Sequence, residues 1–298
     1  MSAFPNKVRI VEVGARDGLQ NEEKVSTQNK VTLINNLAKA GLKHIEAGAF
    51  VSPKWVPQMA DSAKVIAALD LPDVNLSALT PNLKGAQAAH EAGIKEFAIF
   101  TAASESFCKK NINCTIDESI ERFSEVMAFT KQNNIRVRGY VSCVLGCPYE
   151  GEINPQVVLD VSQKLLGLGC YEISLGDTIG IGTAKKVTQL LELLLTHIDR
   201  TKLAVHFHDT YGQALTNIYA ALSLGISTVD AAVAGLGGCP YAKGASGNVA
   251  TEDVVYLLQG LGIDHGIDLQ TLAETGWRIT QALGKKPLSK VAVALHTQ

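Results

Sequence analysis

The hydrophobic and polar positions of the chain alternate between two periods. Eight short apolar runs are separated by longer stretches in which apolar residues recur about every 3.6 positions, as on one face of a helix. Strand followed by helix, repeated in this way, predicts parallel strands joined by crossover helices, and eight such units predict a (β/α)8 TIM barrel. The expected strands are residues 8–14, 44–50, 75–80, 96–102, 136–143, 171–177, 202–208 and 228–236.

Helix boundaries are marked by local signals. Thr115 followed by Glu118 predicts a capping box, and Asn154-Pro155 predicts a helix that begins at a first-turn proline. Residues 269–283 predict an additional C-terminal helix. Other helices are expected to end at Gly41, Gly93, Gly169, Gly225 and Gly262.

The pattern also constrains domain organisation. No linker or shift in composition divides the chain, so we expect one catalytic domain over residues 1–298, with the barrel at about 1–265 and a helical extension at about 266–298. The extension would cover the barrel bottom or pack against a second subunit, which leaves a homodimer or higher homo-oligomer open. The alternative fold is a doubly wound open sheet, but the residues after the first strand, Ala15-Arg16-Asp17-Gly18-Leu19-Gln20, are not its phosphate loop.

Charge and composition exclude several classes of protein. Lys and Arg number 27 and Asp and Glu 29, a net charge of −2 with no basic cluster, which argues against nucleic-acid binding. No apolar run has the roughly 18 residues of a membrane helix, and we recognise no signal, transit or peroxisomal sequence, so we expect a cytoplasmic protein. The six cysteines form no C-x-x-C pair and match no zinc template.

Polar residues gather where the predicted strands end. In a barrel of this kind the chemistry lies at the C-terminal ends of the strands. The residues at or near those ends are Arg16, Asp17, Glu46, Cys143, Asp177, Thr178, His206, His208, Cys239 and Asn248.

The sharpest local signal is His206-Phe207-His208. Residues i and i+2 of a strand share one face, so both imidazoles would face the barrel interior. A single histidine there would more often be a core residue bonded to backbone, but a pair beside carboxylates favours a metal site. With oxygen donors from Asp17 and Asn248, the set favours Mg²⁺ or Mn²⁺, although Zn²⁺ or Co²⁺ would also bind.

Other polar residues allow two interpretations each. Arg16 and Asp17 form either a surface ion pair or a metal ligand beside an oxyanion-stabilising guanidinium. Cys239 is either an idle loop thiol or, close to a cation and a guanidinium, a proton carrier of lowered pKa. We expect Glu12 and Arg138 to form a buried structural ion pair. Lys109, Lys110 and Asn111 form a polar loop that is either simply solvated or a cationic lip for CoA phosphates.

The motifs together resemble a family of metal-dependent lyases and Claisen synthases that share Arg16-Asp17-Gly18 after strand 1 and His206-Phe207-His208 near the end of strand 7. Within it the chain closely resembles the 3-hydroxy-3-methylglutaryl-CoA lyases, whose Cys239 loop the synthase branch lacks. The similarity covers residues 13–22, 50–59, 80–85, 109–114, 138–143, 146–149, 174–180, 206–214 and 235–253.

The resemblance implies cleavage of 3-hydroxy-3-methylglutaryl-CoA to acetyl-CoA and acetoacetate, a ketone body, in leucine or branched-acid catabolism. It implies a cation bound by Asp17, His206, His208 and Asn248. It also implies that Arg16, Glu46, Asp177 and Cys239 belong to the active site, with Asp17, His206 or Cys239 as the base. We expect Gln20 and Thr178 to contact the substrate.

One position departs from the family pattern. Ala49 stands where serine is usual, close to the substrate, so a lyase for a larger 3-hydroxyglutaryl-CoA is an alternative. A synthase joining acetyl-CoA to a 2-oxo acid would use the same barrel and metal. The alternative that is not an enzyme is a barrel that binds acyl-CoA or metal as a sensor, without catalysis.

Overall fold

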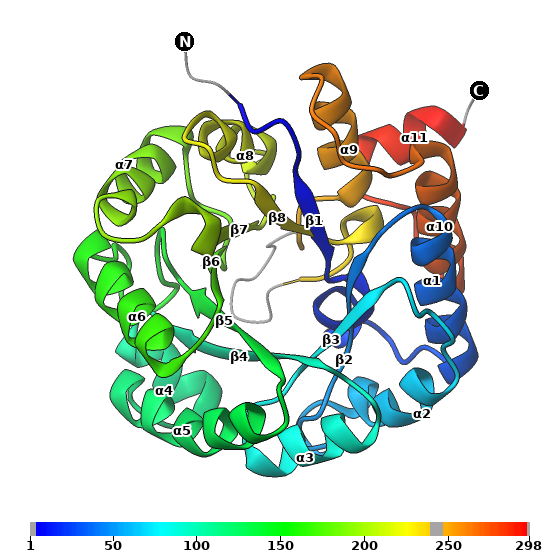
Figure 1. The fold of residues 1–298 in the computed structure, drawn as a ribbon. Coiled ribbons are helices and arrows are strands. Elements are labelled where there is room, and N and C mark those ends of the chain that lie inside the picture. The colour runs from blue at the N-terminus through cyan, green and yellow to red at the C-terminus, as the bar shows by residue number, and fades with distance from the viewer. Residues whose placement is uncertain (1–3, 239–246, 297–298) are drawn as a thin grey trace.

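Eight parallel strands close into a barrel in the computed structural model, which describes residues 4–238 and 247–296 (Figure 1). Each strand pairs with its neighbours in chain order, and β1 closes the barrel against β8. The predicted TIM barrel is therefore confirmed. The strands are β1 Arg9–Glu12, β2 His44–Ala49, β3 Asn75–Leu79, β4 Glu96–Ala102, β5 Arg136–Ser142, β6 Glu172–Asp177, β7 Leu203–Phe207 and β8 Thr228–Ala231.

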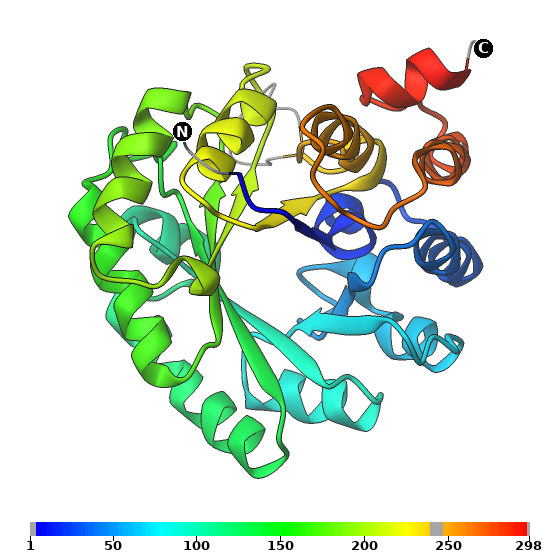
Figure 2. The same cartoon turned by 45° about the horizontal axis from the view of Figure 1, so that its top comes forward.

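Helices surround the barrel and cover its outer face (Figures 1 and 2). The capping box at Thr115 and the proline start at Pro155 are present as predicted, and Gly169 ends its helix at φ 115°. The α-helices are α1 Thr27–Lys39, α2 Ser62–Ala67, α3 Leu83–Glu91, α4 Glu105–Ile112, α5 Ile116–Gln132, α6 Pro155–Leu168, α7 Ala184–Leu195, α8 Ala214–Ser223, α9 Thr251–Gly260, α10 Leu269–Ala282 and α11 Lys290–His296. Single turns are η1 Gly14–Gly18, η2 Pro57–Met59, η3 Arg200–Lys202 and η4 Val233–Gly235.

The first and last strands are shorter than predicted. β1 gives way to the π-helical turn η1, and β8 to the 3-10 turn η4, in which Ala234 has a φ of 60°. The reason is a buried carboxylate: Glu12 Oε1 accepts the backbone N–H groups of Gly14 and Val233, at 2.8 and 2.9 Å. These amides bind a side chain instead of a neighbouring strand. The β-sheet hydrogen bonds therefore end there, and the segments that follow β1 and β8 turn.

The barrel interior is polar at mid-height. A Cβ added to Gly139 would lie 3.1 Å from Leu165 of α6, so that position of β5 faces the helices. Alternation along the strand therefore points Arg138 and Tyr140 inward. Arg138 bonds Asp230 of β8, a strand that is not a neighbour of β5, so the contact crosses the interior. Barrels of this class more often fill this space with branched apolar residues.

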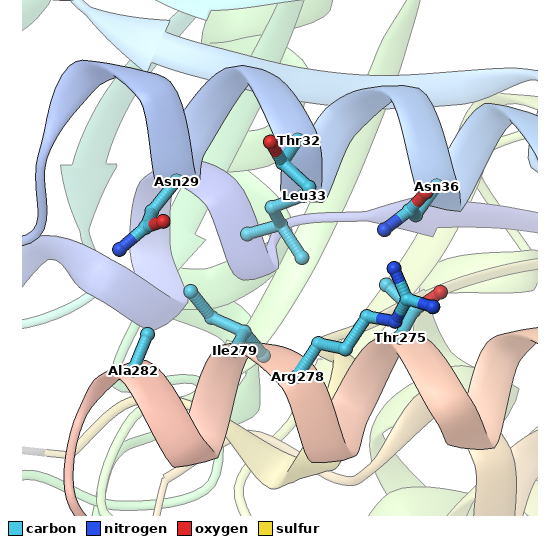
Figure 3. Close-up of a pocket in the computed structure, with 8 residues that line it drawn as sticks. All are labelled: Asn29, Thr32, Leu33, Asn36, Thr275, Arg278, Ile279 and Ala282. Carbon is cyan, nitrogen blue, oxygen red and sulfur yellow. The ribbon is translucent and has the colours of Figure 1, made fainter.

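The C-terminal extension contains two helices where one was predicted. It does not cover the barrel bottom: α10 packs in the outer layer against α1 and α9, and α11 packs on α10 and α9. A cavity of about 60 Å³ lies between α1 and α10, lined by Leu33 and Ile279 with Arg278 at its edge (Figure 3). In the described part of the chain, no helix is long and apolar enough to cross a membrane.

Candidate active site

Asp17, His206 and His208 converge at the C-terminal ends of the strands. Each offers one ligand atom, and these atoms lie within 4.8 Å of one another. His206 lies on β7, whereas His208 follows the strand and forms an isolated bridge with Asn248. The structure thus brings together three of the four residues expected to bind a cation, from η1 and the end of β7.

The π-helical turn η1 aims Arg16 and Asp17 into the barrel mouth. Arg16 is buried, and its guanidinium donates to Asp17 Oδ1 through Nη1 and to Glu46 Oε2 through Nε, both over 2.7 Å. Burial disfavours the charged form of Asp17, but Arg16 and the two imidazoles outweigh it and lower the pKa of Asp17 to about 2. Arg16 and Asp17 therefore form a largely buried ion pair within the site, and not an ion pair exposed on the surface.

Arg16 is linked to the barrel interior through Glu46 and Tyr140. The Tyr140 hydroxyl donates to Glu46 Oε2 over 3.4 Å and accepts from Arg138 Nη1 over 3.1 Å. Burial raises the pKa of Glu46 against the opposing effect of Arg16. Glu46 Oε1 is buried without a hydrogen-bond partner among the described residues, so one oxygen of this carboxyl remains available.

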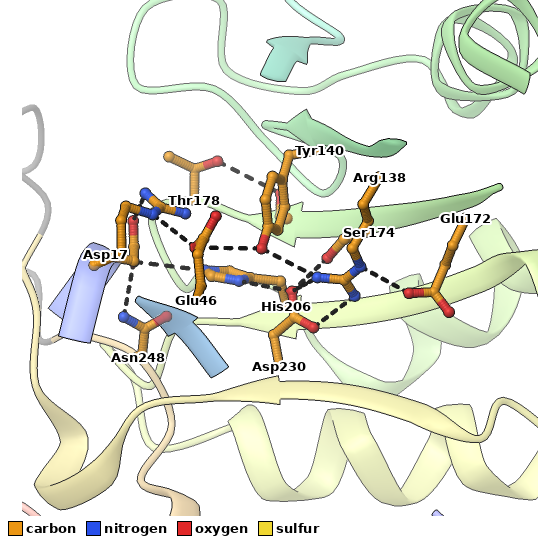
Figure 4. Close-up of polar contacts among 12 residues, drawn as sticks. Asp17, Glu46, Arg138, Tyr140, Glu172, Ser174, Thr178, His206, Asp230 and Asn248 are labelled. Carbon is orange, nitrogen blue, oxygen red and sulfur yellow. Dashed lines mark hydrogen bonds and ion pairs between the residues drawn. The ribbon is translucent and has the colours of Figure 1, made fainter. Parts of the chain in front are cut away.

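Asp230 completes the path back to the imidazoles (Figure 4). It accepts hydrogen bonds from both terminal nitrogens of Arg138, over 2.7 and 2.9 Å, and its Oδ2 lies 3.2 Å from His206 Nδ1. His206 Nε2 is in turn 3.8 Å from Asp17 Oδ2. The contacts form a closed ring through Arg16, Glu46, Tyr140, Arg138, Asp230, His206 and Asp17.

The two imidazoles have opposite electrostatic environments. Burial and the neighbouring His206 lower the pKa of His208 to about 4, which keeps its ring neutral at pH 7. Burial acts the same way on His206, but Asp230 and Asp17 outweigh it and raise the pKa of His206. His208 Nδ1 is buried and has no hydrogen-bond partner in the described part of the chain.

The donor set fits a divalent cation. A buried nitrogen without a partner is costly unless a ligand satisfies it, and His208 Nδ1 is such an atom. Two imidazoles and a carboxylate are common ligands of Mn²⁺, Zn²⁺ and related ions, and the charge of Asp17 offsets that of the cation. Asp17, His206 and His208 could therefore hold the ion.

Asn248 lies against this cluster, whereas Cys239 lies outside the described residues. The Asn248 amide nitrogen donates to Asp17 Oδ2 over 2.8 Å and to the Leu236 carbonyl over 3.1 Å. With the nitrogen committed in this way, the amide oxygen is the atom of Asn248 that could reach a cation.

The side chains of Asp177, Thr178 and Gln20 lie close to the strand ends but make no hydrogen bond to the cluster among the described residues. The backbone of Thr178 does bond the His208 ring. Asp177 accepts the backbone N–H groups of Ile181 and Gly182, and burial raises its pKa to about 6. The Thr178 hydroxyl accepts the backbone N–H of Cys143 over 2.8 Å. Asp177 and Thr178 thus hold turns beside the mouth, and Gln20 is half-buried just beyond η1.

Two local predictions are wrong. Residues Lys109, Lys110 and Asn111 are not a loop but part of α4, which Ser104 caps through its hydroxyl, and Lys110 Nζ lies 3.8 Å from the centre of the Tyr149 ring. Glu12 and Arg138 do not pair with each other. Glu12 binds backbone amides and the Thr251 hydroxyl, while Arg138 binds carboxylates. The two side chains lie on opposite faces of the sheet: Glu12 is in register with Ala231, one position from the inward-facing Asp230, and so faces the helices.

Sequence reasoning missed Tyr140, Ser174 and Asp230 as members of the site. Tyr140 is two residues from Arg138 on one strand, a spacing that places both on the same face. Asp230 is a lone charge inside the apolar β8 segment, and such a residue is rarely buried without a partner. Both signals are present in the sequence, but the partner of each became clear only from the fold.

Comparison with known proteins agrees with this geometry. A model of the HMGL-like family matches residues 7–279. The chain belongs to the HMGL-like family. The mitochondrial hydroxymethylglutaryl-CoA lyase of Gallus gallus is 60% identical to this HMGL-like protein over 98% of the chain and 99% of the relative.

Two further matches come from Pseudomonas aeruginosa. Its 3-hydroxy-3-isohexenylglutaryl-CoA/hydroxy-methylglutaryl-CoA lyase is 57% identical to this HMGL-like protein over 98% of each chain. A crystal structure of hydroxymethylglutaryl-CoA lyase from the same species has a TM-score of 0.97 and 56% identity, and covers 100% of this chain and 99% of the other. The resemblance found in the motifs is confirmed over nearly the whole chain.

Proposed function

We propose that this HMGL-like protein is a divalent-metal-dependent carbon–carbon lyase that cleaves 3-hydroxy-3-methylglutaryl-CoA to acetyl-CoA and acetoacetate. The observation that carries the proposal is the convergence of Asp17, His206 and His208 next to the buried guanidinium of Arg16. Near-full-length identity of 57–60% to lyases of that name supports the substrate. Such a reaction would belong to leucine or branched-acid catabolism.

The reaction breaks the bond between C2 and C3 of a 3-hydroxy thioester. The C3 hydroxyl loses its proton, the C2–C3 electron pair moves to C2, and C3 becomes the ketone of acetoacetate. The fragment left on CoA is an enolate that takes one proton at C2 and becomes acetyl-CoA. The protein must therefore accept one proton, stabilise an oxyanion and return one proton.

We assign these tasks to residues of the ring of contacts and its neighbours. A divalent ion, when bound, polarises the C3 hydroxyl and orients the substrate. Asp17, His206, His208 and Asn248 would hold that ion. With Nδ1 bonded to Asp230 and Nε2 on the ion, His206 would have no lone pair left, so Asp17 would take the hydroxyl proton. Arg16, held by Glu46, would face the thioester oxygen where negative charge develops. Cys239 would donate the proton to C2, unless it is itself the base.

Further residues would bind or orient the substrate. Asp177 and Thr178 hold the turns that border the mouth, and Gln20 follows η1 on the other side. Lys109, Lys110 and Asn111 on α4 would meet the CoA phosphates, since α4 follows a strand end. A single catalytic domain, with the barrel and its helical extension acting together, is the organisation we propose.

A second candidate substrate is a 3-hydroxyglutaryl-CoA with a larger group at C3. Ala49 is 2% exposed at the end of β2, and its backbone N–H donates to the Ser62 hydroxyl over 3.1 Å. A methyl side chain here leaves more room than the usual serine and removes a hydroxyl. The Pseudomonas aeruginosa relative whose name includes 3-hydroxy-3-isohexenylglutaryl-CoA supports testing this substrate class.

The deciding experiment follows both products. The thiol-reduced protein is incubated with 3-hydroxy-3-methylglutaryl-CoA and Mg²⁺ or Mn²⁺, with a chelator-treated control. We expect acetyl-CoA and acetoacetate in equal amounts, and only with metal. Absence of products with metal bound, and turnover of a larger 3-hydroxyglutaryl-CoA in parallel, would favour the second substrate. Condensation of acetyl-CoA with a 2-oxo acid would instead identify a synthase.

A further inference from the structure

We propose that Asp230, which no motif singles out, is a positioning residue that fixes the tautomer and ring orientation of His206 for cation binding. The inference rests on the metal site of the proposed function. It concerns how one ligand of that site is prepared before any ion arrives.

The contact between Asp230 and His206 sets the direction of the imidazole. Asp230 Oδ2 lies 3.2 Å from His206 Nδ1. A carboxylate can only accept a hydrogen bond, so Nδ1 must carry the proton in this contact. In the neutral ring the lone pair is then at Nε2, the atom that faces Asp17 Oδ2 at 3.8 Å. The nitrogen that faces the cluster is therefore the one able to bind a cation.

Asp230 is itself held from three directions. Arg138 donates to Oδ2 through Nη1 and to Oδ1 through Nη2, at 2.9 and 2.7 Å, and the Ser174 hydroxyl donates to Oδ2 over 2.7 Å. Asp230 is 1% exposed, so water does not compete with these donors. A carboxylate held by a bidentate guanidinium has little freedom to rotate. Its contact with Nδ1 therefore restricts the orientation of the His206 ring.

His208 is held differently from His206. Its Nδ1 has no partner among the described residues, and its ring bonds the backbone of Thr178. Among the described residues, a buried carboxylate therefore supports one of the two imidazoles. Carboxylates that hold the second nitrogen of a metal-binding histidine typically contribute about 10- to 100-fold in metal affinity or activity.

Glu172 provides a matched control within the same buried network. It accepts a hydrogen bond from Arg138 Nε over 2.7 Å, on the side of the guanidinium away from His206 (Figure 4). It also pairs with Arg9. Asp230→Asn and Glu172→Gln each remove one negative charge from the partners of Arg138 at nearly constant volume. Only the first takes the negative charge from the group that accepts from His206 Nδ1, and one amide oxygen cannot serve Arg138, Ser174 and His206 as two carboxylate oxygens do.

The experiment measures Mn²⁺ affinity directly, by electron paramagnetic resonance of free Mn²⁺, in the full-length wild-type protein and both variants. We expect Asp230→Asn to weaken Mn²⁺ binding by about 10- to 100-fold and Glu172→Gln to leave it close to wild type. Turnover of Asp230→Asn should recover in part at high Mn²⁺. Equal affinity in Asp230→Asn and wild type would overturn the inference.

Two further measurements separate the possible failures. If the wild-type protein binds no Mn²⁺, the proposed metal site fails, whatever Asp230 does. If Asp230→Asn does not fold, the tautomer of the wild-type protein is read from ¹⁵N-histidine NMR at alkaline pH without metal. A proton on Nδ1 of His206 supports the proposal, and a proton on Nε2 contradicts it.

Discussion

Two groups of buried charges in this barrel differ in whether their polar atoms are satisfied. In the deep group, Arg138, Glu172 and Asp230, every guanidinium nitrogen and carboxylate oxygen has a partner. In the mouth group, Arg16, Asp17, Glu46, His206 and His208, two buried atoms have none among the described residues: Glu46 Oε1 and His208 Nδ1. Asp17 in the mouth group is also partly exposed.

This difference shows why burial and charge alone do not identify an active site. Both groups contain an arginine that bridges two acidic residues. A fully satisfied network contributes rigidity and has no atom left for a ligand. The mouth group has atoms left over, so a cation and a substrate can complete its hydrogen bonding and coordination. We therefore expect substitutions in the mouth to affect turnover and those in the deep group to affect stability first.

The largest expected effect is in the mouth. Arg16→Gln removes the guanidinium that would stabilise the developing oxyanion, and we expect the rate to fall about 10²- to 10³-fold while Mn²⁺ still binds. Arg9→Gln, which removes a guanidinium that pairs with Glu172 from outside the deep group, should leave the rate near wild type. Steady-state kinetics on both variants measure this. Near-normal turnover of Arg16→Gln would exclude this residue from the mechanism and remove the contrast between the two groups.

The second largest expected effect is on the stability of the protein, through the deep group. Glu172→Gln leaves Arg138 and Arg9 short of one negative charge in a buried site, and we expect the free energy of unfolding to fall by about 3 kcal/mol. Urea titration measures it. The exposed pair Lys186–Glu152 gives the control, because Glu152→Gln should change stability by less than about 1 kcal/mol. If the two variants are equally stable, the deep network does not hold the barrel together.

Glu12 separates the effect of burial from that of charge pairing, since it is buried and has no cationic partner among the described residues. Burial raises its pKa from 4.5 to about 7, against hydrogen bonds from Thr251, Val233 and Gly14. The folded state then binds more protons than the unfolded state between pH 4.5 and 7, so stability falls as pH rises through that window, by about 3 kcal/mol from this group.

The variant Glu12→Gln tests whether stability falls as the pH rises. The amide oxygen can accept both backbone N–H groups and its nitrogen can donate to Thr251, so the fold should persist. We expect the variant to lose part of the decrease in stability between pH 4.5 and 7, measured by urea unfolding at a series of pH values. Burial also raises the pKa of Glu252, which preserves some slope in both proteins. Parallel curves for variant and wild type would contradict the assignment.

The smallest expected effect is outside both groups, on α4. Lys110→Ala removes an exposed ammonium that would meet the CoA phosphates, and an exposed ion pair is worth about 0.5–1 kcal/mol. The KM for the acyl-CoA should therefore rise about two- to fivefold with kcat unchanged. Lys164→Ala on α6 removes another exposed ammonium, one that pairs with Asp117, and should leave KM as it was. Equal KM values in the two variants would remove Lys110 from CoA binding.

The sequence by itself determined the architecture and most members of the mouth group. Strand and helix periods, caps and glycine ends depend on neighbours along the chain, so the barrel and several boundaries of its helices were predictable. The gathering of Arg16, Asp17 and His206 at one mouth was also predictable, because all parallel strands end at one side of a barrel.

Only the tertiary structure decided which charged residues meet. Arg138 could have paired with Glu12 or with Asp230, and the face of the sheet on which each side chain lies selected Asp230. The early ends of β1 and β8 likewise depend on Glu12, which binds amides far apart in the chain. The physical reason is that a hydrogen bond across the interior joins residues such as Arg138 and Asp230, 92 positions apart, and no local pattern encodes their distance.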